Sequence, residues 1–205
     1  MCSSASEQML TIATGNAGKA KEFGDMLGHQ WVIKTLLDYP EIPDVIEDGD
    51  SFEANACKKA VEISRVIAGP VLADDSGLEV DSLNGDPGIF SARYAGEHKD
   101  DAANNAKLMR EMDAVPEGQR GAQFHCALAI AENGAVLATF DGIIRGQILR
   151  EPRGSNGFGY DPYFQPDGYP ITTAQMEPRD KHVISHRGKA GRDAAAYLKQ
   201  HFDCL

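Results

Sequence analysis

The chain has 205 residues, of which 42% are hydrophobic and 25% charged, and these are ordinary values for one globular domain spanning residues 1–205. The formal net charge of −11 at pH 7 argues against a general nucleic-acid surface, which needs an excess of Lys and Arg. No apolar run is long enough to cross a bilayer, so we expect no membrane partner. The four Cys residues lie far apart, as expected in a reducing cytoplasm and not in a disulfide framework or zinc site.

The N-terminal region predicts a strand, a loop, a helix and a second strand. Residues 1–8 carry no signal-peptide pattern, and we expect them to be flexible. The elements that follow are a buried strand at residues 9–13, a tight loop at 14–19, a helix at 19–27 and a strand at 31–35.

Residues 50–67 give the strongest helix signal in the chain. Their apolar positions recur at intervals of three and four residues, as on one face of a helix. Asp50 and Glu53 have the spacing of a capping box, and Gly69 and Pro70 predict the end of the helix.

A pair of adjacent carboxylates, Asp74 and Asp75, is the most informative feature of the sequence. Residues 69–72 read as a short buried strand, so the segment from Ala73 to Gly77 would begin at its end. A buried carboxylate needs a cation or strong hydrogen-bond donors, and a divalent metal is a common solution. The alternative is a solvated turn, because Asp, Ser and Gly all favour turns.

The second half of the chain mixes strands with helices. Asn133 and Gly134 form a strong hairpin signal, which requires antiparallel neighbours in the sheet. We therefore expect a mixed sheet covered by helices. The predicted elements are a helix at residues 100–112, strands at 124–130, 136–140 and 143–149, and a helix at 188–202.

The loop at residues 14–19 has the composition of a phosphate-binding turn. Its glycines allow backbone N–H groups to converge, Lys19 adds a cation, and a helix N-terminus follows. It is not a Walker A loop, because Ala20 occupies the position where that motif needs Ser or Thr. The alternative is a plain connector.

Two further segments combine polar residues with a predicted helix. Glu47 lies in an acidic run before the long helix, and Asn55 and Lys59 share one face of that helix. Such residues are ordinarily solvent-facing. Lys181 and the segment from Ser185 to Gly188 offer donors for a carbonyl or phosphate, with surface charge as the alternative.

Residues 154–162 alternate glycines with aromatic residues. An aromatic ring on a Gly-rich loop can stack on a flat base while nearby backbone amides read the base's edge. The alternative is an aromatic-anchored surface loop.

Taken together and in order, these segments resemble the inosine triphosphate pyrophosphatase family, in particular its bacterial branch. The resemblance spans about residues 10–198, and the matching blocks are residues 14–19, 47–55 with Lys59, 73–77, 85–94, 157–162 and 185–188. It implies an α/β (mixed α+β) fold with a long central mixed β-sheet flanked by helices, and two lobes with the active-site cleft between them. It also implies a Mg²⁺-dependent enzyme that converts ITP, dITP and XTP to the nucleoside monophosphate and pyrophosphate, and a homodimer.

The resemblance further implies roles for individual residues. Asp75, Lys19 and Lys59 would be catalytic, with Asp75 as the base that activates water. Glu47 and Asp75 would bind Mg²⁺, with Asp74 as an accessory carboxylate. The substrate would be bound by Thr14, Gly15, Asn16, Ala17, Gly18, Lys19, Ser76, Phe158, Gly159, Tyr160, Asp161, Lys181, His186 and Arg187.

Two alternative functions stay open at this level. One is a Maf-type pyrophosphatase acting on pyrimidine triphosphates, which the His186–Arg187 segment and the Phe158–Asp161 loop disfavour. The other is a non-catalytic purine nucleotide sensor, which would gain little from a carboxylate pair placed to activate water.

Overall fold

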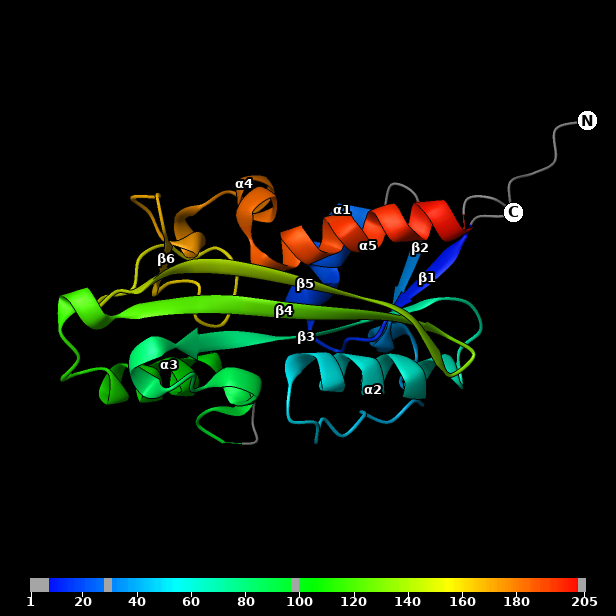
Figure 1. Ribbon diagram of the computed structural model, residues 1–205, viewed down its shortest axis with the longest axis horizontal. Coiled ribbons are helices and arrows are strands. Elements are labelled where there is room, and N and C mark those ends of the chain that lie inside the picture. Colours follow the sequence, from blue (N-terminus) through cyan, green and yellow to red (C-terminus); the bar gives the residue numbers. More distant parts are fainter. Residues whose placement is uncertain (1–7, 28–30, 97–99, 203–205) are drawn as a thin grey trace, which may run out of the picture. The chain divides into compact units, whose positions relative to one another are not determined.

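A six-stranded sheet in the order β2-β1-β3-β4-β5-β6 is the framework of this computed structural model, which describes residues 8–27, 31–96 and 100–202 (Figure 1). The strands are β1 (Met9–Ile12), β2 (Val32–Thr35), β3 (Val71–Val80), β4 (Gly121–Glu132), β5 (Ala135–Ile148) and β6 (Phe164–Pro166). The α-helices are α1 (Ala17–Leu27), α2 (Phe52–Ser64), α3 (Asp101–Glu111), α4 (Pro178–Ile184) and α5 (His186–Phe202).

The predicted mixed sheet is confirmed. Strand β1 pairs in parallel with both β2 and β3, whereas β5 and β6 are antiparallel. The predicted hairpin joins β4 to β5, and its two turn residues, Asn133 and Gly134, have positive φ angles of 52° and 78°. Such angles are those of the two-residue turns that match strand twist, and Asn and Gly adopt them at low cost.

The prediction that β3 ends before the carboxylate pair is wrong. The strand continues from Val71 through Asp74, Asp75 and Gly77 to Val80, so the alternative of a solvated turn is wrong as well. Asp74 is buried, and its carboxylate forms an ion pair with Lys19. Because this cation offsets the lost solvation, the extended backbone can carry a carboxylate into the interior.

Other element boundaries also need correction. Helix α2 begins at Phe52, and Ser51 is its N-cap, with the Ser51 hydroxyl accepting from the N–H of Ala54 at 3.2 Å. The capping role predicted for Asp50 is therefore wrong. The strands predicted at residues 136–140 and 143–149 form one continuous strand, β5. Residues 17–19, predicted as loop, form the first turn of α1, and β6 and α4 were not predicted.

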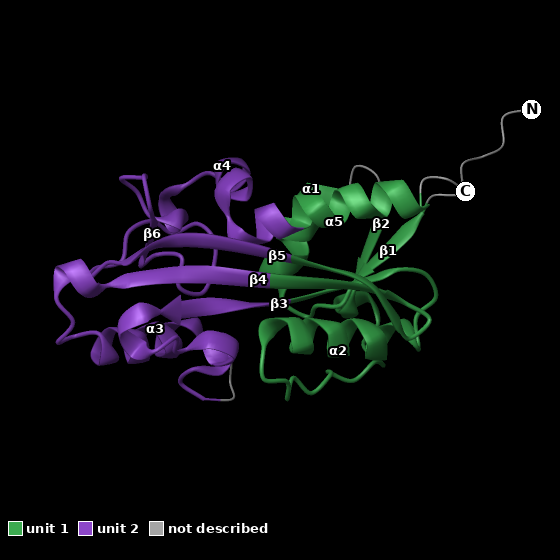
Figure 2. Ribbon diagram, in the orientation of Figure 1, with its two compact units in different colours: residues 1–74, 127–140, 191–205 green, residues 75–126, 141–190 purple. Residues whose placement is uncertain are grey.

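The described residues divide into two compact units (Figure 2). Unit 1 comprises residues 1–74, 127–140 and 191–205, and unit 2 comprises residues 75–126 and 141–190. Strands β3, β4 and β5 and helix α5 each contribute residues to both units. The predicted flexible N-terminus falls, except for Gln8, outside the described residues.

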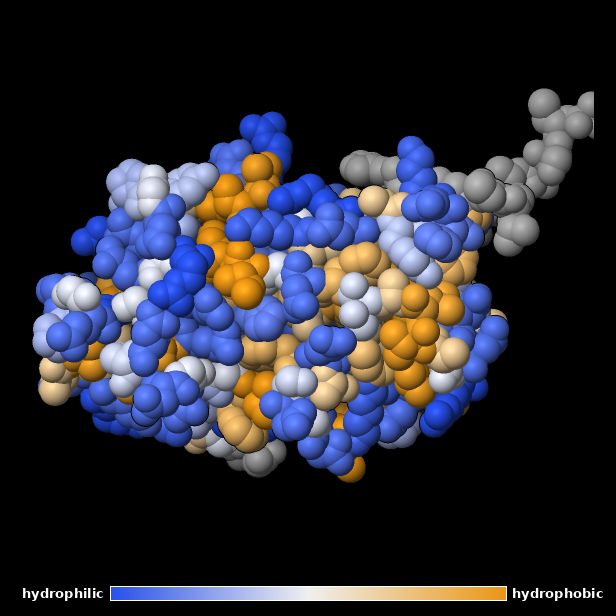
Figure 3. Space-filling model, in the orientation of Figure 1, coloured by the Kyte–Doolittle hydropathy of each residue, from blue (hydrophilic) through white to orange (hydrophobic). Residues whose placement is uncertain are grey.

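Unit 1 buries most of β1 and its parts of β3 and β4 on both faces. Leu10 and Ile12 of β1 are fully buried, as are Phe23 of α1 and Ala60 of α2. Helix α2 lies on one side of these strands, and α1 and α5 lie together on the other, where Gly191 faces Met26 (Figure 1). Figure 3 shows a hydrophobic area over the β4–β5 hairpin. Val136 and Leu137, which follow the hairpin turn in β5, are exposed.

Unit 2 buries one face of its strands. Its core combines Leu78 and Val80 of β3 with Phe124 of β4, Leu108 of α3 and Phe164 of β6. This core fixes the strands and helices that carry the residues of the Gly-rich loop and the His186–Arg187 segment. Among the described residues, no helix is long and apolar enough to cross a membrane.

Candidate active site

The turn between β1 and α1 is shaped by its own side chains. The Thr14 hydroxyl accepts from the N–H of Asn16 at 3.1 Å, and the Asn16 side chain accepts from the N–H of Lys19 at 3.0 Å. Gly15, Asn16 and Ala17 are exposed. The first N–H groups of α1 therefore lie at the surface of unit 1, where a helix N-terminus favours an anion.

Two lysines and two carboxylates meet beside this turn in unit 1. Lys19 forms an ion pair with Asp74, whose side chain is fully buried. Lys59 forms an ion pair with Glu47 and donates to the carbonyl oxygen of Asp74 at 2.9 Å. Lys59 thus connects the segment before α2 to β3, and the four predicted residues form one cluster.

Asn55 holds the segment that carries Glu47 against α2. This side chain is 1% exposed, and it accepts from the N–H of Gly49 at 2.8 Å. A methyl group at Gly49 would lie 2.7 Å from the same oxygen, so only glycine allows this approach. The expectation that Asn55 faces solvent is wrong.

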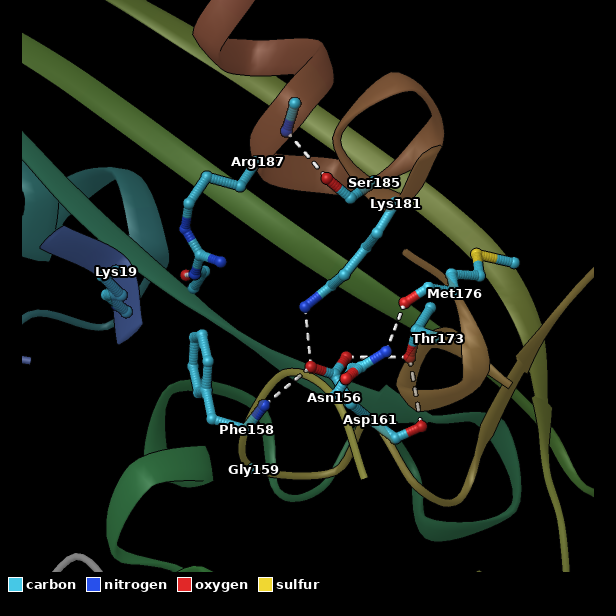
Figure 4. A network of polar contacts seen from close by, with 12 residues as sticks. Lys19, Asn156, Phe158, Gly159, Asp161, Thr173, Met176, Lys181, Ser185 and Arg187 are labelled. Atoms are coloured by element: carbon cyan, nitrogen blue, oxygen red, sulfur yellow. Dashed lines mark hydrogen bonds and ion pairs between the residues drawn. The ribbon is translucent and has the colours of Figure 1, made fainter. Parts of the chain in front are cut away.

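The predicted base-binding residues form a network in unit 2 (Figure 4). The Asp161 carboxylate accepts from Lys181 Nζ at 2.7 Å and from the N–H of Phe158 at 3.0 Å through one oxygen. Its other oxygen accepts from the Thr173 hydroxyl at 2.8 Å. Asp161 and Lys181 are both buried, so the ion pair is desolvated, and both carboxylate oxygens of Asp161 accept hydrogen bonds.

The Phe158 ring has two cations nearby. Lys181 Nζ lies 5.3 Å and Arg187 Cζ 5.7 Å from its centroid, within the range of cation–π attraction. Arg187 also donates to the Ser76 hydroxyl at 2.7 Å, although the two residues are 111 positions apart. Ser76 is thereby joined to the predicted base-binding residues.

His186 and Arg187 are buried, so the alternative of surface charge is wrong for both. They occupy the start of α5, where the Ser185 hydroxyl accepts from the N–H of Gly188 at 3.0 Å. The His186 ring stacks on Phe124 of β4, with centroids 4.8 Å apart and an interplanar angle of 12°. The sheet therefore sets the orientation of the imidazole.

The backbone amides of the Gly-rich loop are largely engaged within unit 2. The N–H of Phe158 is donated to Asp161, that of Gly159 to Asp101 at 2.7 Å, and that of Asp161 to the carbonyl of Phe158 at 3.3 Å. This arrangement leaves the reading of a base mainly to side-chain donors, and not to the amides that the sequence suggested.

Tyr160 serves the core of unit 2 through its side chain. Its hydroxyl donates to the carbonyl oxygen of Ser91 at 2.8 Å, and burial raises the pKa of the phenol above its usual range. A substrate contact from this position would therefore come from the backbone.

Several supporting residues carry no signal in the sequence. Thr173, Asp101 and Asn105 all bond to the Gly-rich loop, and Asn156 of the loop itself donates to the carbonyl of Met176 at 2.9 Å. These partners are 12 to 58 residues apart in sequence, a separation that no local pattern reveals.

Carboxylate side chains are the candidate metal ligands of this chain. Among the described residues, no group of three or more His, Cys, Asp or Glu side chains could hold a metal ion. Mg²⁺ does not require such a group, because it is often held by one or two carboxylates together with substrate phosphates and water. Glu47 of unit 1 and Asp75 of unit 2 each carry hard oxygen donors of the kind that this mode of binding uses.

Comparison with known proteins identifies relatives over most of the chain. The model of the Ham1 family matches residues 10–197. A protein of Geobacillus kaustophilus named dITP/XTP pyrophosphatase is 52% identical over 88% of this chain and 89% of its own length. A protein of the same name from Lactiplantibacillus plantarum is 50% identical over 90% of this chain and 92% of its own length.

Solved structures agree with this family match. A HAM1 protein from Coxiella burnetii has a TM-score of 0.84 and 37% identity, covering 94% of this chain and 99% of its own. A nucleoside-triphosphatase, also named dITP/XTP pyrophosphatase, from Mycobacterium abscessus has a TM-score of 0.72 and 42% identity, covering 93% and 99%.

Proposed function

This chain belongs to the Ham1 family, and we propose that it hydrolyses the deaminated purine nucleotides ITP, dITP and XTP to the nucleoside monophosphate and pyrophosphate. Two relatives, 52% and 50% identical, are named dITP/XTP pyrophosphatases. The observation that carries the proposal is the network in unit 2, where Lys181 and Arg187 lie near the Phe158 ring (Figure 4). An aromatic ring accompanied by strong donors suits a flat base with carbonyl oxygens on its edge.

The donor-rich network also supports discrimination against adenine. Hypoxanthine and xanthine present O6, an acceptor, where adenine presents an amino group. Lys and Arg carry donors and no acceptor, so they can bond to O6 but would face the adenine amino group as donor against donor. Leaving buried donors unpaired can reject a substrate by several orders of magnitude.

The residues of unit 1 suit the triphosphate. The exposed turn of Gly15, Asn16 and Ala17 presents the N-terminus of α1, and Lys19 and Lys59 add positive charge beside it. Both lysines are held by carboxylates, so their ammonium groups are oriented before a substrate arrives. Pre-oriented cations stabilise a phosphoryl-transfer transition state more effectively than mobile ones.

Asp75 is the proposed base, and Mg²⁺ is the proposed cofactor. Asp75 is 6% exposed and adjoins Ser76, which Arg187 contacts. A carboxylate at this position would orient the attacking water and accept its proton. Glu47 and Asp75 would hold Mg²⁺, which neutralises phosphate charge when bound.

We further infer a homodimer and a cytoplasmic location from the family resemblance and from the Cys pattern. Sedimentation velocity of the purified chain tests the first, with twice the chain mass of 22.1 kDa expected. A monomer at all concentrations would contradict it.

Product analysis tests the proposed reaction. The protein is incubated with ITP and Mg²⁺, and the products are resolved by ion-exchange chromatography. One IMP and one pyrophosphate are expected for each ITP consumed, with turnover lost on addition of EDTA and restored by excess Mg²⁺. IDP with inorganic phosphate, or no turnover, would contradict the assignment; binding of ITP without turnover would indicate a sensor.

A further inference from the structure

Helix α3 is hydrogen-bonded to the Gly-rich loop, residues 154–162, through the backbone of Gly159. The N–H of Gly159 donates to Asp101 Oδ2 at 2.7 Å, and its carbonyl oxygen accepts from Asn105 Nδ2 at 2.9 Å. Asp101 and Asn105 are four residues apart, so they project from one face of α3. Both polar groups of one loop residue are therefore bonded to one helix.

The conformation of Gly159 makes this contact specific to its backbone. Its φ angle is +61°, in the left-handed region that favours glycine, and no atom lies within 4 Å of the position a Cβ would take. The glycine is thus required by the turn and not by crowding. Both polar groups of this glycine are hydrogen-bonded to α3, so the helix holds the turn through its backbone.

The amide of Asn105 can be oriented in only one way. Its Nδ2 donates to two carbonyl oxygens, those of Gly159 and Asp101, each at 2.9 Å. Among the described residues, its Oδ1 is buried without a hydrogen-bond partner. Because two acceptors meet the same nitrogen, an oxygen at this position would be repelled by both.

Gly159 directly follows Phe158, so the hydrogen bonds from α3 also restrict the position of the Phe158 ring. The N–H of Phe158 is held from the other direction by Asp161 at 3.0 Å (Figure 4). The backbone on both sides of Phe158 is therefore fixed, by Asp161 on one side and by α3 on the other. Lys181 Nζ and Arg187 Cζ lie 5.3 and 5.7 Å from the centroid of the Phe158 ring. These distances are maintained only if the backbone of Phe158 stays in place.

We propose that Asp101 and Asn105 are positioning residues for base recognition, fixing Phe158 through the backbone of Gly159. The proposal rests on the proposed function, since it assigns Phe158 to the purine. It predicts that weakening these hydrogen bonds impairs base recognition and leaves the phosphate chemistry intact, because the predicted phosphate residues Thr14 to Lys19 and Lys59 belong to unit 1, whereas α3 and the Gly-rich loop belong to unit 2.

Two opposite substitutions separate this role from a purely structural one. Asn105→Asp replaces the donor by an acceptor at nearly constant shape, so it opposes the Gly159 carbonyl. Asp101→Asn keeps an acceptor oxygen, so the bond from the Gly159 N–H can persist. If these residues served only to stabilise the helix, Asp101→Asn would have the larger effect. Asp101 lies in the first turn of α3, where its negative charge interacts favourably with the helix dipole.

The test is steady-state kinetics with ITP and ATP on the full chain, with thermal unfolding followed in parallel. Asn105→Asp should raise KM for ITP by about tenfold, the scale of one lost hydrogen bond, with kcat retained and the ITP-to-ATP ratio of kcat/KM reduced. Asp101→Asn should remain close to wild type. Arg110→Ala, on an exposed position of the same helix, is the control.

Three results would overturn the positioning role: wild-type kinetics in Asn105→Asp, equal losses for ITP and ATP, or a larger effect of Asp101→Asn. If Asn105→Asp does not fold, Asn105→Ala decides by the same criteria. A wild-type chain that does not turn over ITP contradicts the proposed function and this proposal together. Wild-type turnover of ITP with an unaffected Asn105→Asp contradicts the positioning role alone.

Discussion

At the scale of single residues, several of the predicted site residues are buried charged groups. Asp74, Asp161, Lys181 and Arg187 are each at most 5% exposed. Burying such groups costs free energy unless partners are supplied, and the structure supplies them as ion pairs and hydrogen bonds. The residue types were visible in the sequence, whereas the partners were not.

Asp75→Asn tests the proposed base. The substitution keeps the shape and hydrogen-bonding capacity of the side chain but removes its charge and basicity. We expect ITP turnover to fall by about two orders of magnitude or more, with little change in the thermal unfolding midpoint. Near-normal turnover by the folded variant, measured as pyrophosphate release, would remove Asp75 from the mechanism.

Lys19→Ala tests the phosphate site. Lys19 is paired with Asp74 beside the exposed N-terminus of α1, so the variant should bind ITP more weakly while binding inosine almost as before. Isothermal calorimetry with both ligands measures this difference. Lys21→Ala, an exposed change in the same helix, is the control. Equal losses for ITP and inosine would instead assign Lys19 to the base or to the fold.

At the scale of elements, the sequence predicted structure that depends on local patterns better than structure that depends on contacts between elements. The hairpin at Asn133 and Gly134 and the helix within residues 100–112 are confirmed, because turn chemistry and helical periodicity are local signals. The extension of β3 through Asp74 and Asp75 was missed, because the cation that permits it, Lys19, comes from another element. Helix α4 and the three-residue β6 were too short for a periodic signal.

Gly142 is expected to tolerate no side chain, because α5 begins directly against it. A methyl group there would lie 2.0 Å from the carbonyl oxygen of His186 and 2.8 Å from the nitrogen of Ala190. Gly142→Ala should lower the free energy of unfolding by about 1–3 kcal/mol, as overpacking does, and displace the His186–Arg187 segment. Urea unfolding measures the first effect and KM for ITP the second.

Gly118→Ala is the matched control for Gly142→Ala. No atom lies within 4 Å of its added methyl group, and its φ angle is not in the left-handed region. Equal stability of the two variants would show that β5 and α5 can separate locally at no cost.

The Asp81–Arg145 pair should contribute stability that disappears in acid. Arg145 donates to both carboxylate oxygens of Asp81, at 3.0 and 2.6 Å, and these hydrogen bonds hold the pKa of Asp81 below its usual value. The pKa of Asp81 is lower in the folded than in the unfolded state. The pair therefore contributes its full stabilisation of the fold at pH values above the unfolded-state pKa of about 4. This stabilisation is lost as the pH falls through the folded-state pKa.

The pair is half-exposed, so its contribution should not exceed about 1 kcal/mol. Urea unfolding of wild type and Asp81→Asn at about pH 7 and about pH 3 measures it, and the difference should shrink in acid. A difference that stays constant or grows in acid would contradict the proposed pairing.

At the scale of the whole molecule, the candidate residues divide between the two units. The residues proposed for the phosphates, Thr14 to Lys19 with Lys59, belong to unit 1, and those proposed for the base, Phe158 to Asp161 with Lys181, His186 and Arg187, belong to unit 2. The chain passes from one unit to the other between Asp74 and Asp75. The sequence predicted both sets because each contains a compact motif.

The long-range contacts of unit 2 could not be predicted in the same way. Ser76 and Arg187 are 111 residues apart, and Asp101 and Gly159 are 58 apart. Such contacts follow from the order of strands in the sheet, which single-sequence periodicity does not specify. This explains why the roles of Asp101, Asn105 and Thr173 emerged only from the structure.

A panel of nucleotides tests whether this chain selects deaminated purine triphosphates. We would measure kcat/KM for pyrophosphate release from ITP, dITP, XTP, ATP, GTP, dUTP and TTP under saturating Mg²⁺. We expect kcat/KM for ITP, dITP and XTP to exceed the values for all the other nucleotides by about two orders of magnitude or more, because buried donors reject a mismatched base. Preference for dUTP or TTP, or comparable values for ITP and ATP, would contradict this selectivity.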